Sequence, residues 1–187
     1  MQDIPEMTFE QIKTLQSGSK EQKMTALESS TNVAEPKILE AIISMFDDAD
    51  IELRGEAFST LLLNERDISD VLLANLKNQS KNIRGYCALV LANRGEKKSI
   101  PKIIQLTEDE SAMVRSCAIG ALGFLRATEA LDVIQRCLKD TNTEVKKSAI
   151  KSAIDIKDRT LLTKLDELSQ ENDPEISKLI FLARNNL

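Results

Sequence analysis

The chain has 187 residues, of which 42% are hydrophobic and 29% charged, a composition typical of a folded globular protein rather than a disordered or fibrous one. It contains no histidine, so an imidazole base for Ser-His-Asp or Cys-His catalysis is missing, as is the commonest metal ligand. Its net charge of −5 disfavours binding to a phosphate backbone, and nucleic acid is therefore not the expected partner.

The first residues of the chain and its cysteines indicate where in the cell the protein is found. Residues 1–5 show neither the basic nor the apolar segment of a signal peptide, and no apolar run approaches the roughly 20 residues that a membrane helix needs. The three cysteines, Cys87, Cys117 and Cys137, lack Cys-x-x-Cys spacing, which argues against a zinc site or a disulfide framework. We expect a cytoplasmic protein without a membrane segment.

Apolar residues at helical spacing predict about twelve helices, and no alternating pattern predicts a strand. Thr8 and Ser19 each have glutamine three residues later, Asp50 and Asp173 precede apolar runs, and Pro36 opens another, all signals typical of helix starts. In chain order the helices are expected at residues 8–17, 20–29, 36–47, 51–64, 68–77, 81–93, 99–107, 111–125, 129–139, 144–156, 159–170 and 174–185.

A basic residue recurs every 30 or 31 residues, and we call it the anchor. The anchors are Arg54, Arg84, Arg115 and Lys146, and the register extends back to Lys23 and forward to Ser177. Apolar residues follow three and four positions after each anchor, and a second apolar helix ends before the next one. Each unit is therefore a helical hairpin, which carries the anchor on its first helix.

One hairpin of about 31 residues cannot bury its own apolar face, so stability must come from stacking successive hairpins. The pattern predicts an all-α fold, a right-handed α-solenoid that forms a single domain over residues 1–187. A capping helix is expected near 8–17, repeats starting near residues 19, 50, 80, 111 and 142, and a second capping helix near 174–185.

Each anchor lies in an Ala-rich helix, and a second helix such as Ser99-Ile100-Pro101-Lys102-Ile103-Ile104 follows it. This pattern resembles HEAT-like repeat proteins. The chain resembles the short-repeat kind also found in phycobilisome lyases, and the resemblance covers roughly residues 8–185. It implies a solenoid whose second helices line a concave surface that binds other proteins. It also suggests two alternatives, a lyase-like subunit that handles a tetrapyrrole and a DNA-binding protein like the HEAT-like glycosylases.

An acid or amide stands six residues before each anchor. The column Asp48, Asn78, Asp109 and Asp140 accompanies Arg54, Arg84, Arg115 and Lys146 at this fixed offset. Acidic groups near helix N-termini satisfy free amides, and arginine forks can bridge neighbouring units. We interpret the two columns as a structural ladder, and we expect no catalytic residue, cofactor site or metal site in this chain.

Positions fourteen, thirteen and ten residues before the next anchor define the expected partner-binding face on the second helices. Its candidates mix both charges: Glu40, Ser44, Asp70, Lys102, Gln105, Asp132, Arg136, Lys164 and Glu167. Mixed charge suits a protein or peptide better than a phosphate backbone. We predict a non-catalytic interaction module; an ordinary solvated face is the alternative, and homo-oligomerisation is left open.

Four glycines and three lysines on the first helices of the hairpins also need an interpretation. Gly55 and Gly85 follow their anchors directly, and Gly120 and Gly123 lie inside a predicted helix. We interpret all four as allowing close packing of helices. The best basic cluster, Lys146, Lys147 and Lys151, is expected to face outward.

Overall fold

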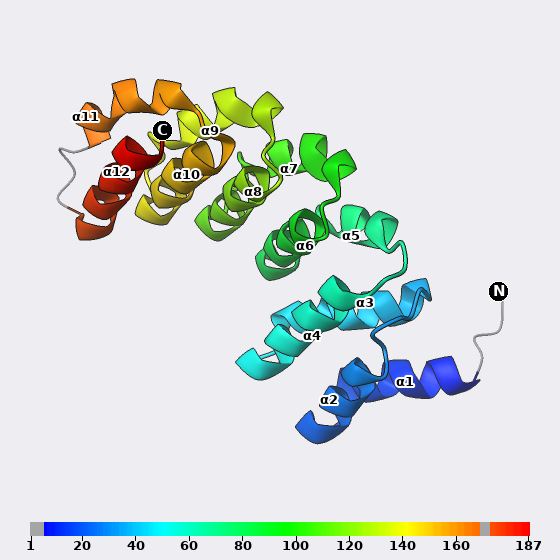
Figure 1. Cartoon of the computed structure of the whole chain (residues 1–187). Helices are drawn as coiled ribbons and strands as arrows, with labels where there is room; N and C mark the ends of the chain where they lie inside the picture. Colours follow the sequence, from blue (N-terminus) through cyan, green and yellow to red (C-terminus); the bar gives the residue numbers. More distant parts are fainter. Residues whose placement is uncertain (1–5, 169–172) are drawn as a thin grey trace. The chain divides into compact units, whose positions relative to one another are not determined.

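The computed structural model describes residues 6–168 and 173–187, and in these residues all regular structure is helical (Figure 1). The helices are α1 (Glu6–Ser17), α2 (Lys20–Glu28), α3 (Pro36–Ser44), α4 (Ile51–Leu63), α5 (Ser69–Asn75), α6 (Lys81–Asn93), α7 (Ile100–Leu106), α8 (Ala112–Phe124), α9 (Leu131–Cys137), α10 (Thr143–Ile156), α11 (Leu165–Leu168) and α12 (Pro174–Asn186). The predicted all-α fold of helical hairpins is confirmed.

Helix starts follow the sequence signals in most places. Ser19 and Gln22 form a reciprocal capping box, and the side chains of Asp50 and Asp173 accept hydrogen bonds from the first amides of α4 and α12. The cap expected at Thr8 is wrong, because α1 begins two residues earlier. The helix expected at 159–170 begins as a 3-10 turn over Arg159–Lys164, and its residues 169–170 lie outside the described part of the chain.

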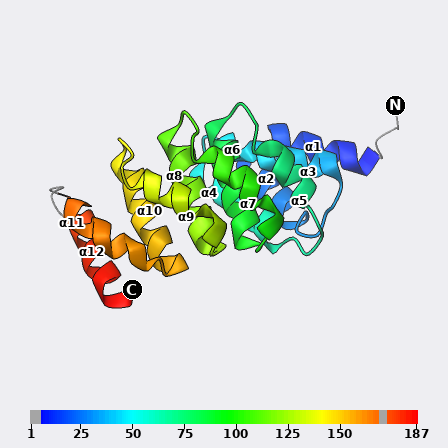
Figure 2. The same cartoon turned by 90° about the horizontal axis from the view of Figure 1, so that it is seen from above.

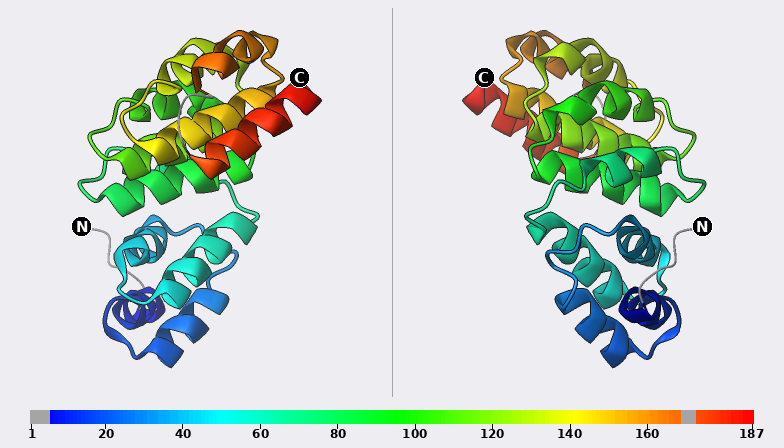
Figure 3. Two further views of the ribbon diagram at one scale, coloured as in Figure 1. Left: turned by 90° about the vertical axis from the view of Figure 1, so that its left-hand side faces the viewer. Right: turned by 90° about the vertical axis from the view of Figure 1, so that its right-hand side faces the viewer.

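Contacts group the chain into two compact units, residues 1–90 and 91–187, with the division inside α6. In the first unit α1 packs against α2 and α3, and α2 against α4. In the second unit α8, α10 and α12 lie side by side (Figure 1, Figure 3), while α7 and α9 pack against α8 and α10 as the other halves of the hairpins (Figure 1, Figure 2). A single domain over residues 1–187 stays a prediction.

The apolar column that follows the anchors forms the core of each unit. Leu27, Ile119 and Ile150, four residues after their anchors, are fully buried. Phe58 occupies the same column but is half-buried, and Phe181 is 67% exposed. The aromatic members of the column thus reach the surface where the aliphatic ones do not.

The glycines of α4 and α8 differ in what surrounds them. A Cβ on Gly123 would lie 2.5 Å from Ser152 Oγ and 2.7 Å from Ser152 Cα, so the expected close helix packing is confirmed there. A Cβ on Gly55 or Gly120 would meet nothing within 4 Å, and the packing interpretation is wrong for these two. The absence of a side chain at Gly55 therefore leaves open space on α4.

None of the helices in the described residues combines the length and apolar character that crossing a membrane requires.

Candidate functional site

The acid-or-amide column closes the turn before each anchor helix. The side-chain Oδ1 atoms of Asp48, Asn78, Asp109 and Asp140 accept hydrogen bonds of 2.9, 3.0, 2.9 and 2.8 Å from the backbone amide two residues later. This repeated Asx turn is the local reason why an acid or amide recurs with the same period as the helices.

The anchor arginines also bind these turns, through backbone carbonyl oxygens. Nη1 of Arg54, Arg84 and Arg115 donates to the carbonyl oxygens six and five residues earlier, at 2.7–3.2 Å. Arg54 therefore directs its guanidinium toward the backbone at the start of its own helix. These bonds tie each anchor to the turn before its own helix, and a purely structural role for the ladder stays a prediction.

Two ion pairs connect neighbouring repeats within the units. Nε and Nη2 of Arg115 make a bidentate contact with the Asp140 carboxylate at 2.8 and 2.9 Å, and Lys23 Nζ lies 2.8 Å from Asp48 Oδ2. The cations hold the pKa of Asp140 and of Asp48 below the usual range. Asp140 in turn raises the pKa of Arg115.

The expected partner face on the second helices lies at the surface of each unit. Eight of its nine residues are exposed and Lys164 is half-buried. Some of them bind polar groups of adjacent repeats: Asn75 Nδ2 donates to both carboxylate oxygens of Glu40 at 3.0 Å, and Arg136 Nη2 lies 3.4 Å from Glu108 Oε1. This face is polar and exposed, and its use by a partner stays a prediction.

The first unit contains an apolar groove on the anchor helices that the sequence did not single out. We call it the α4–α6 groove; its volume is about 310 Å³, and it is lined by Ile51, Arg54, Gly55, Phe58, Tyr86 and Leu89. Ile51 is 72% exposed, although it is a large aliphatic side chain. Its exposure next to half-buried rings creates a continuous apolar surface of the kind that commonly marks a binding site.

Two aromatic rings that line this groove, Phe58 and Tyr86, form a cluster with a third ring, Phe46. Phe46, which is fully buried, lies with its ring centroid 5.2 Å from that of Tyr86 and 6.5 Å from that of Phe58. The centroids of Phe58 and Tyr86 are 6.5 Å apart in an edge-to-face arrangement. Half of the chain's six aromatic side chains therefore gather in one cluster. Such contacts hold the exposed ring faces in fixed positions.

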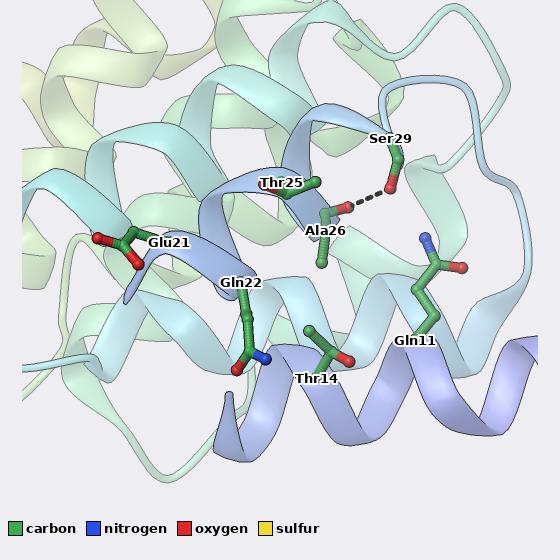
Figure 4. Close-up of a pocket in the computed structure, with 7 residues that line it drawn as sticks. All are labelled: Gln11, Thr14, Glu21, Gln22, Thr25, Ala26 and Ser29. Atoms are coloured by element: carbon green, nitrogen blue, oxygen red, sulfur yellow. Dashed lines mark hydrogen bonds between the residues drawn. The ribbon is translucent and has the colours of Figure 1, made fainter. Parts of the chain in front are cut away.

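A second, polar depression lies between α1 and α2 (Figure 4), with a volume of about 410 Å³. Its lining is Gln11, Thr14, Glu21, Gln22, Thr25, Ala26 and Ser29. Several of these groups already bind locally: Gln11 donates to Ser30 at 2.8 Å, Ser29 to the Ala26 carbonyl at 2.9 Å, and Gln22 accepts from the Ser19 amide at 2.8 Å. Their polar atoms serve the hairpin itself, which makes this depression a weaker candidate.

Lys147 lines a cleft between α10 and α12 that has a volume of about 210 Å³. The expectation that Lys147 faces outward is wrong. Lys147 is 8% exposed rather than outward-facing, and its Nζ lies 2.5 Å from Glu175, 3.0 Å from Glu144 and 3.5 Å from Asp173. These contacts fasten α12 to α10, and the ion pair with Lys147 lowers the pKa of Glu175. Lys151, one turn later, is exposed as expected.

The thiols offer no activated nucleophile. All three cysteines are free, Cys87 and Cys137 are buried, and Cys117 is half-buried. Burial raises the pKa of Cys117 and of Cys137 to about 11, and raises that of Cys87 further. They are therefore protonated near neutral pH and act as core residues.

The α4–α6 groove left a signal in the sequence. At the column four after the anchor, Phe58 replaces the Leu27, Ala88 and Ile119 of other units, and at the column two after the anchor Tyr86 replaces Thr25 and Cys117. Two adjacent repeats thus place aromatic residues in columns that the other units fill with small or aliphatic ones, except for Glu56 and Phe181. Comparing the repeats column by column, rather than only averaging them, would have found the groove.

Periodic hairpins, Asx turns and anchor arginines together define the fold of HEAT- and armadillo-like helical repeat proteins. Residues 69–152 match a family model described as HEAT repeats. The resemblance to these proteins inferred from the sequence is confirmed.

Among individual proteins, the chain is 26% identical over 160 residues to Protein YibA of Escherichia coli (strain K12), which covers 81% of this chain and 56% of that protein. The chain thus spans about half the length of this curated relative. A phycocyanin lyase chain from the CpcE–CpcF complex of Nostoc sp. PCC7120 superimposes with a TM-score of 0.69 at 18% identity, covering 78% of this chain and 97% of that one.

A designed armadillo repeat protein solved with the peptide (KR)4 superimposes with a TM-score of 0.60 at 17% identity, covering 95% of this chain and 98% of that one. These similarities to solved structures concern the fold.

Proposed function

We propose that this protein is a non-catalytic binding module that takes up an extended segment of another protein in the α4–α6 groove. The observation that carries the proposal is the groove itself, in which exposed Ile51 and the half-buried rings of Phe58 and Tyr86 lie beside the open space at Gly55. Fixed aromatic faces that are partly open to water are typical anchors of peptide recognition.

The lining of the groove supports binding rather than chemistry. Its one charged residue, Arg54, directs Nη1 to the carbonyls of Asp48 and Ala49, and the lining contains no Asp, Glu, Lys, Ser or Cys. The fold is shared with a designed armadillo repeat protein that binds a peptide, which makes such a role compatible with the architecture. Three free thiols fit a reducing compartment, so we place the protein in the cytoplasm.

Selection of peptides from a phage-displayed library on the purified chain tests this proposal. Gly55→Leu places a side chain in the groove from an exposed helical position where a Cβ meets no atom within 4 Å, so the variant is expected to fold. Gly120→Leu is its matched control on α8, because that position is open as well. We expect enriched peptides that bind the wild type and Gly120→Leu but lose at least about tenfold in affinity on Gly55→Leu.

Two other outcomes argue against the groove. If no sequence is enriched, the peptide-binding role is wrong. If peptides bind Gly55→Leu as well as the wild type, the site lies elsewhere, and Lys102→Glu combined with Arg136→Glu then tests the mixed-charge face of the second helices. Circular dichroism of each variant checks that the helices are intact.

The alternative of a tetrapyrrole-handling subunit draws on the likeness to a phycocyanin lyase chain. That likeness is at 18% identity, and the groove of about 310 Å³ has a single tyrosine among its aliphatic and aromatic walls. Titration of a free bilin with the protein tests it: a shifted absorption band favours this role, and an unchanged spectrum excludes it.

A further inference from the structure

The two units differ in charge, and the groove lies in the acidic one. Residues 1–90 contain nine Lys and Arg against 15 Asp and Glu, a net charge of −6, whereas residues 91–187 contain 16 against 15, a net charge of +1. The overall value of −5 therefore conceals a strongly acidic unit beside a nearly neutral one. A ligand of the first unit encounters a negative field that attracts cations.

Negative charge is concentrated on the helix that builds the groove. Between residues 47 and 56, α4 and the turn before it carry five carboxylates, Asp47, Asp48, Asp50, Glu52 and Glu56, against the single cation Arg54. Lys23 pairs with Asp48, and Lys20 pairs with Asp50 and Glu52. Five carboxylates thus face three cations, and the surroundings of the groove stay negative.

The carboxylates at the edge of this region are accessible. The Glu52 side chain is 68% exposed, and Asp47 accepts hydrogen bonds from two neutral groups, Ser80 Oγ at 2.7 Å and Asn82 Nδ2 at 2.9 Å. Arg54 is the one charged residue that lines the groove, and its guanidinium donates to the turn carbonyls at 2.7 and 3.2 Å. An incoming cation therefore meets one guanidinium among the lining residues and an excess of carboxylates over residues 47–56.

Apolar walls, ring faces and an excess of carboxylates on the neighbouring residues together match a lysine or arginine side chain. Its methylene stem packs on apolar surface while the charged head stays near water and acids. The negative face of an aromatic ring also attracts ammonium and guanidinium groups, and Phe58 and Tyr86 present such rings. Resting on the proposed function, we infer that the α4–α6 groove selects a basic segment of a partner protein, with a Lys or Arg stem seated between Ile51, Phe58 and Tyr86.

Fluorescence anisotropy with three matched peptides tests this selectivity. The basic probe is a fluorescein-labelled nonapeptide, Gly-Ser-Lys-Arg-Leu-Arg-Lys-Ser-Gly; in the neutral probe Gln replaces every Lys and Arg, and in the acidic probe Glu does. We expect the basic probe to bind at least about tenfold more tightly than the neutral one, and the acidic probe not to bind. Raising the salt from about 50 to about 500 mM weakens the basic probe.

Two sets of variants connect the charge preference to the groove. Gly55→Leu lowers affinity for the basic probe at least about tenfold, while Gly120→Leu leaves it unchanged. Glu52→Gln combined with Glu56→Gln lowers it about fivefold, whereas Glu28→Gln with Glu65→Gln, exposed acids of the same unit but outside residues 47–56, lowers it by less than about twofold.

The outcomes separate this inference from the proposed function. Equal binding of the basic and neutral probes, both lost in Gly55→Leu, overturns the basic preference and leaves the peptide-binding role standing. Unchanged affinity of Gly55→Leu for the basic probe shows that charge acts elsewhere and overturns the assignment to the groove. Failure of the basic probe to bind overturns the inference, and the library selection then decides whether the chain binds peptides of other composition.

Discussion

At the scale of single residues, Asp140 shows how one side chain serves two purposes. Its Oδ1 accepts the Asn142 amide at 2.8 Å to close a turn, and its carboxylate binds the Arg115 fork of the preceding repeat at 2.8 and 2.9 Å. Asn78 occupies the same column and closes its own turn at 3.0 Å. The turn therefore needs an acid or an amide, whereas the bridge between repeats needs the charge.

We predict that Asp140→Asn lowers the free energy of unfolding by about 1–2 kcal/mol, because it keeps the turn and loses the charged fork. Asp140→Ala loses both contacts and leaves Arg115 without its carboxylate, for an expected cost of about 2–4 kcal/mol. Urea unfolding followed by circular dichroism measures both. Equal losses for the two variants would show that the ion pair, rather than the turn, accounts for the whole effect.

At the scale of elements, the contact between α8 and α10 depends on one position without a side chain. Gly123 lies against Ser152, whose Oγ donates to the Ile119 carbonyl at 2.8 Å. A Cβ at this position would approach backbone as well as side-chain atoms of Ser152, so the two helices would have to move apart. Gly120, one turn earlier on the same helix, meets no such neighbour.

The same substitution at these two glycines is expected to have opposite effects. Gly123→Ala lowers the free energy of unfolding by about 1–3 kcal/mol because it overpacks the α8–α10 contact. Gly120→Ala raises it by about 0.5–1 kcal/mol, because alanine favours the helix and loses no contact. Thermal and urea unfolding of both variants checks the pair. A stabilising Gly123→Ala would contradict the close approach of the two helices.

At the scale of the whole molecule, carboxylates connect folding to pH. Cations and hydrogen bonds from backbone amides or, at Asp158, from the Thr160 and Gln135 side chains hold the pKa of several acids in both units below the usual range: Asp48, Asp50, Asp140, Asp158, Asp173 and Glu175. The unfolded chain therefore takes up protons at these groups at a higher pH than the folded chain does. Their stabilising contribution is present above the unfolded pKa of about 4 and is lost as the pH falls through the folded values.

We predict a free energy of unfolding that is nearly constant between about pH 6 and 8 and decreases steadily below about pH 4.5. Urea unfolding at a series of pH values measures the curve. Asp140→Asn removes one of the titrating groups, so its loss of stability relative to the wild type should shrink at low pH. A variant whose loss is the same at pH 7 and at about pH 3 would contradict the linkage.

The sequence by itself determined the period, most of the helices and the caps at Ser19, Asp50 and Asp173, since these depend on local signals such as apolar spacing and an acid or amide at a turn. It also identified Asp140 and Arg115 as ladder residues, because a fixed offset repeats in every unit. Tertiary structure decided which of those helical faces remain uncovered. Periodicity shows that Ile51, Gly55 and Phe58 share a face of α4, but not how much of that face the neighbouring helices bury.

Lys147 is the converse case, in which the tertiary structure buries a side chain that the sequence pattern placed at the surface. Its position one residue after an anchor suggested an outward-facing cation, yet Glu175 and Asp173 at the start of α12 enclose it. The burial of a side chain depends on the neighbour that packs on it, and here that neighbour lies 26–28 residues further along the chain. Local pattern therefore fixes the elements, whereas stacking of one hairpin on the next fixes the groove and the ion pairs.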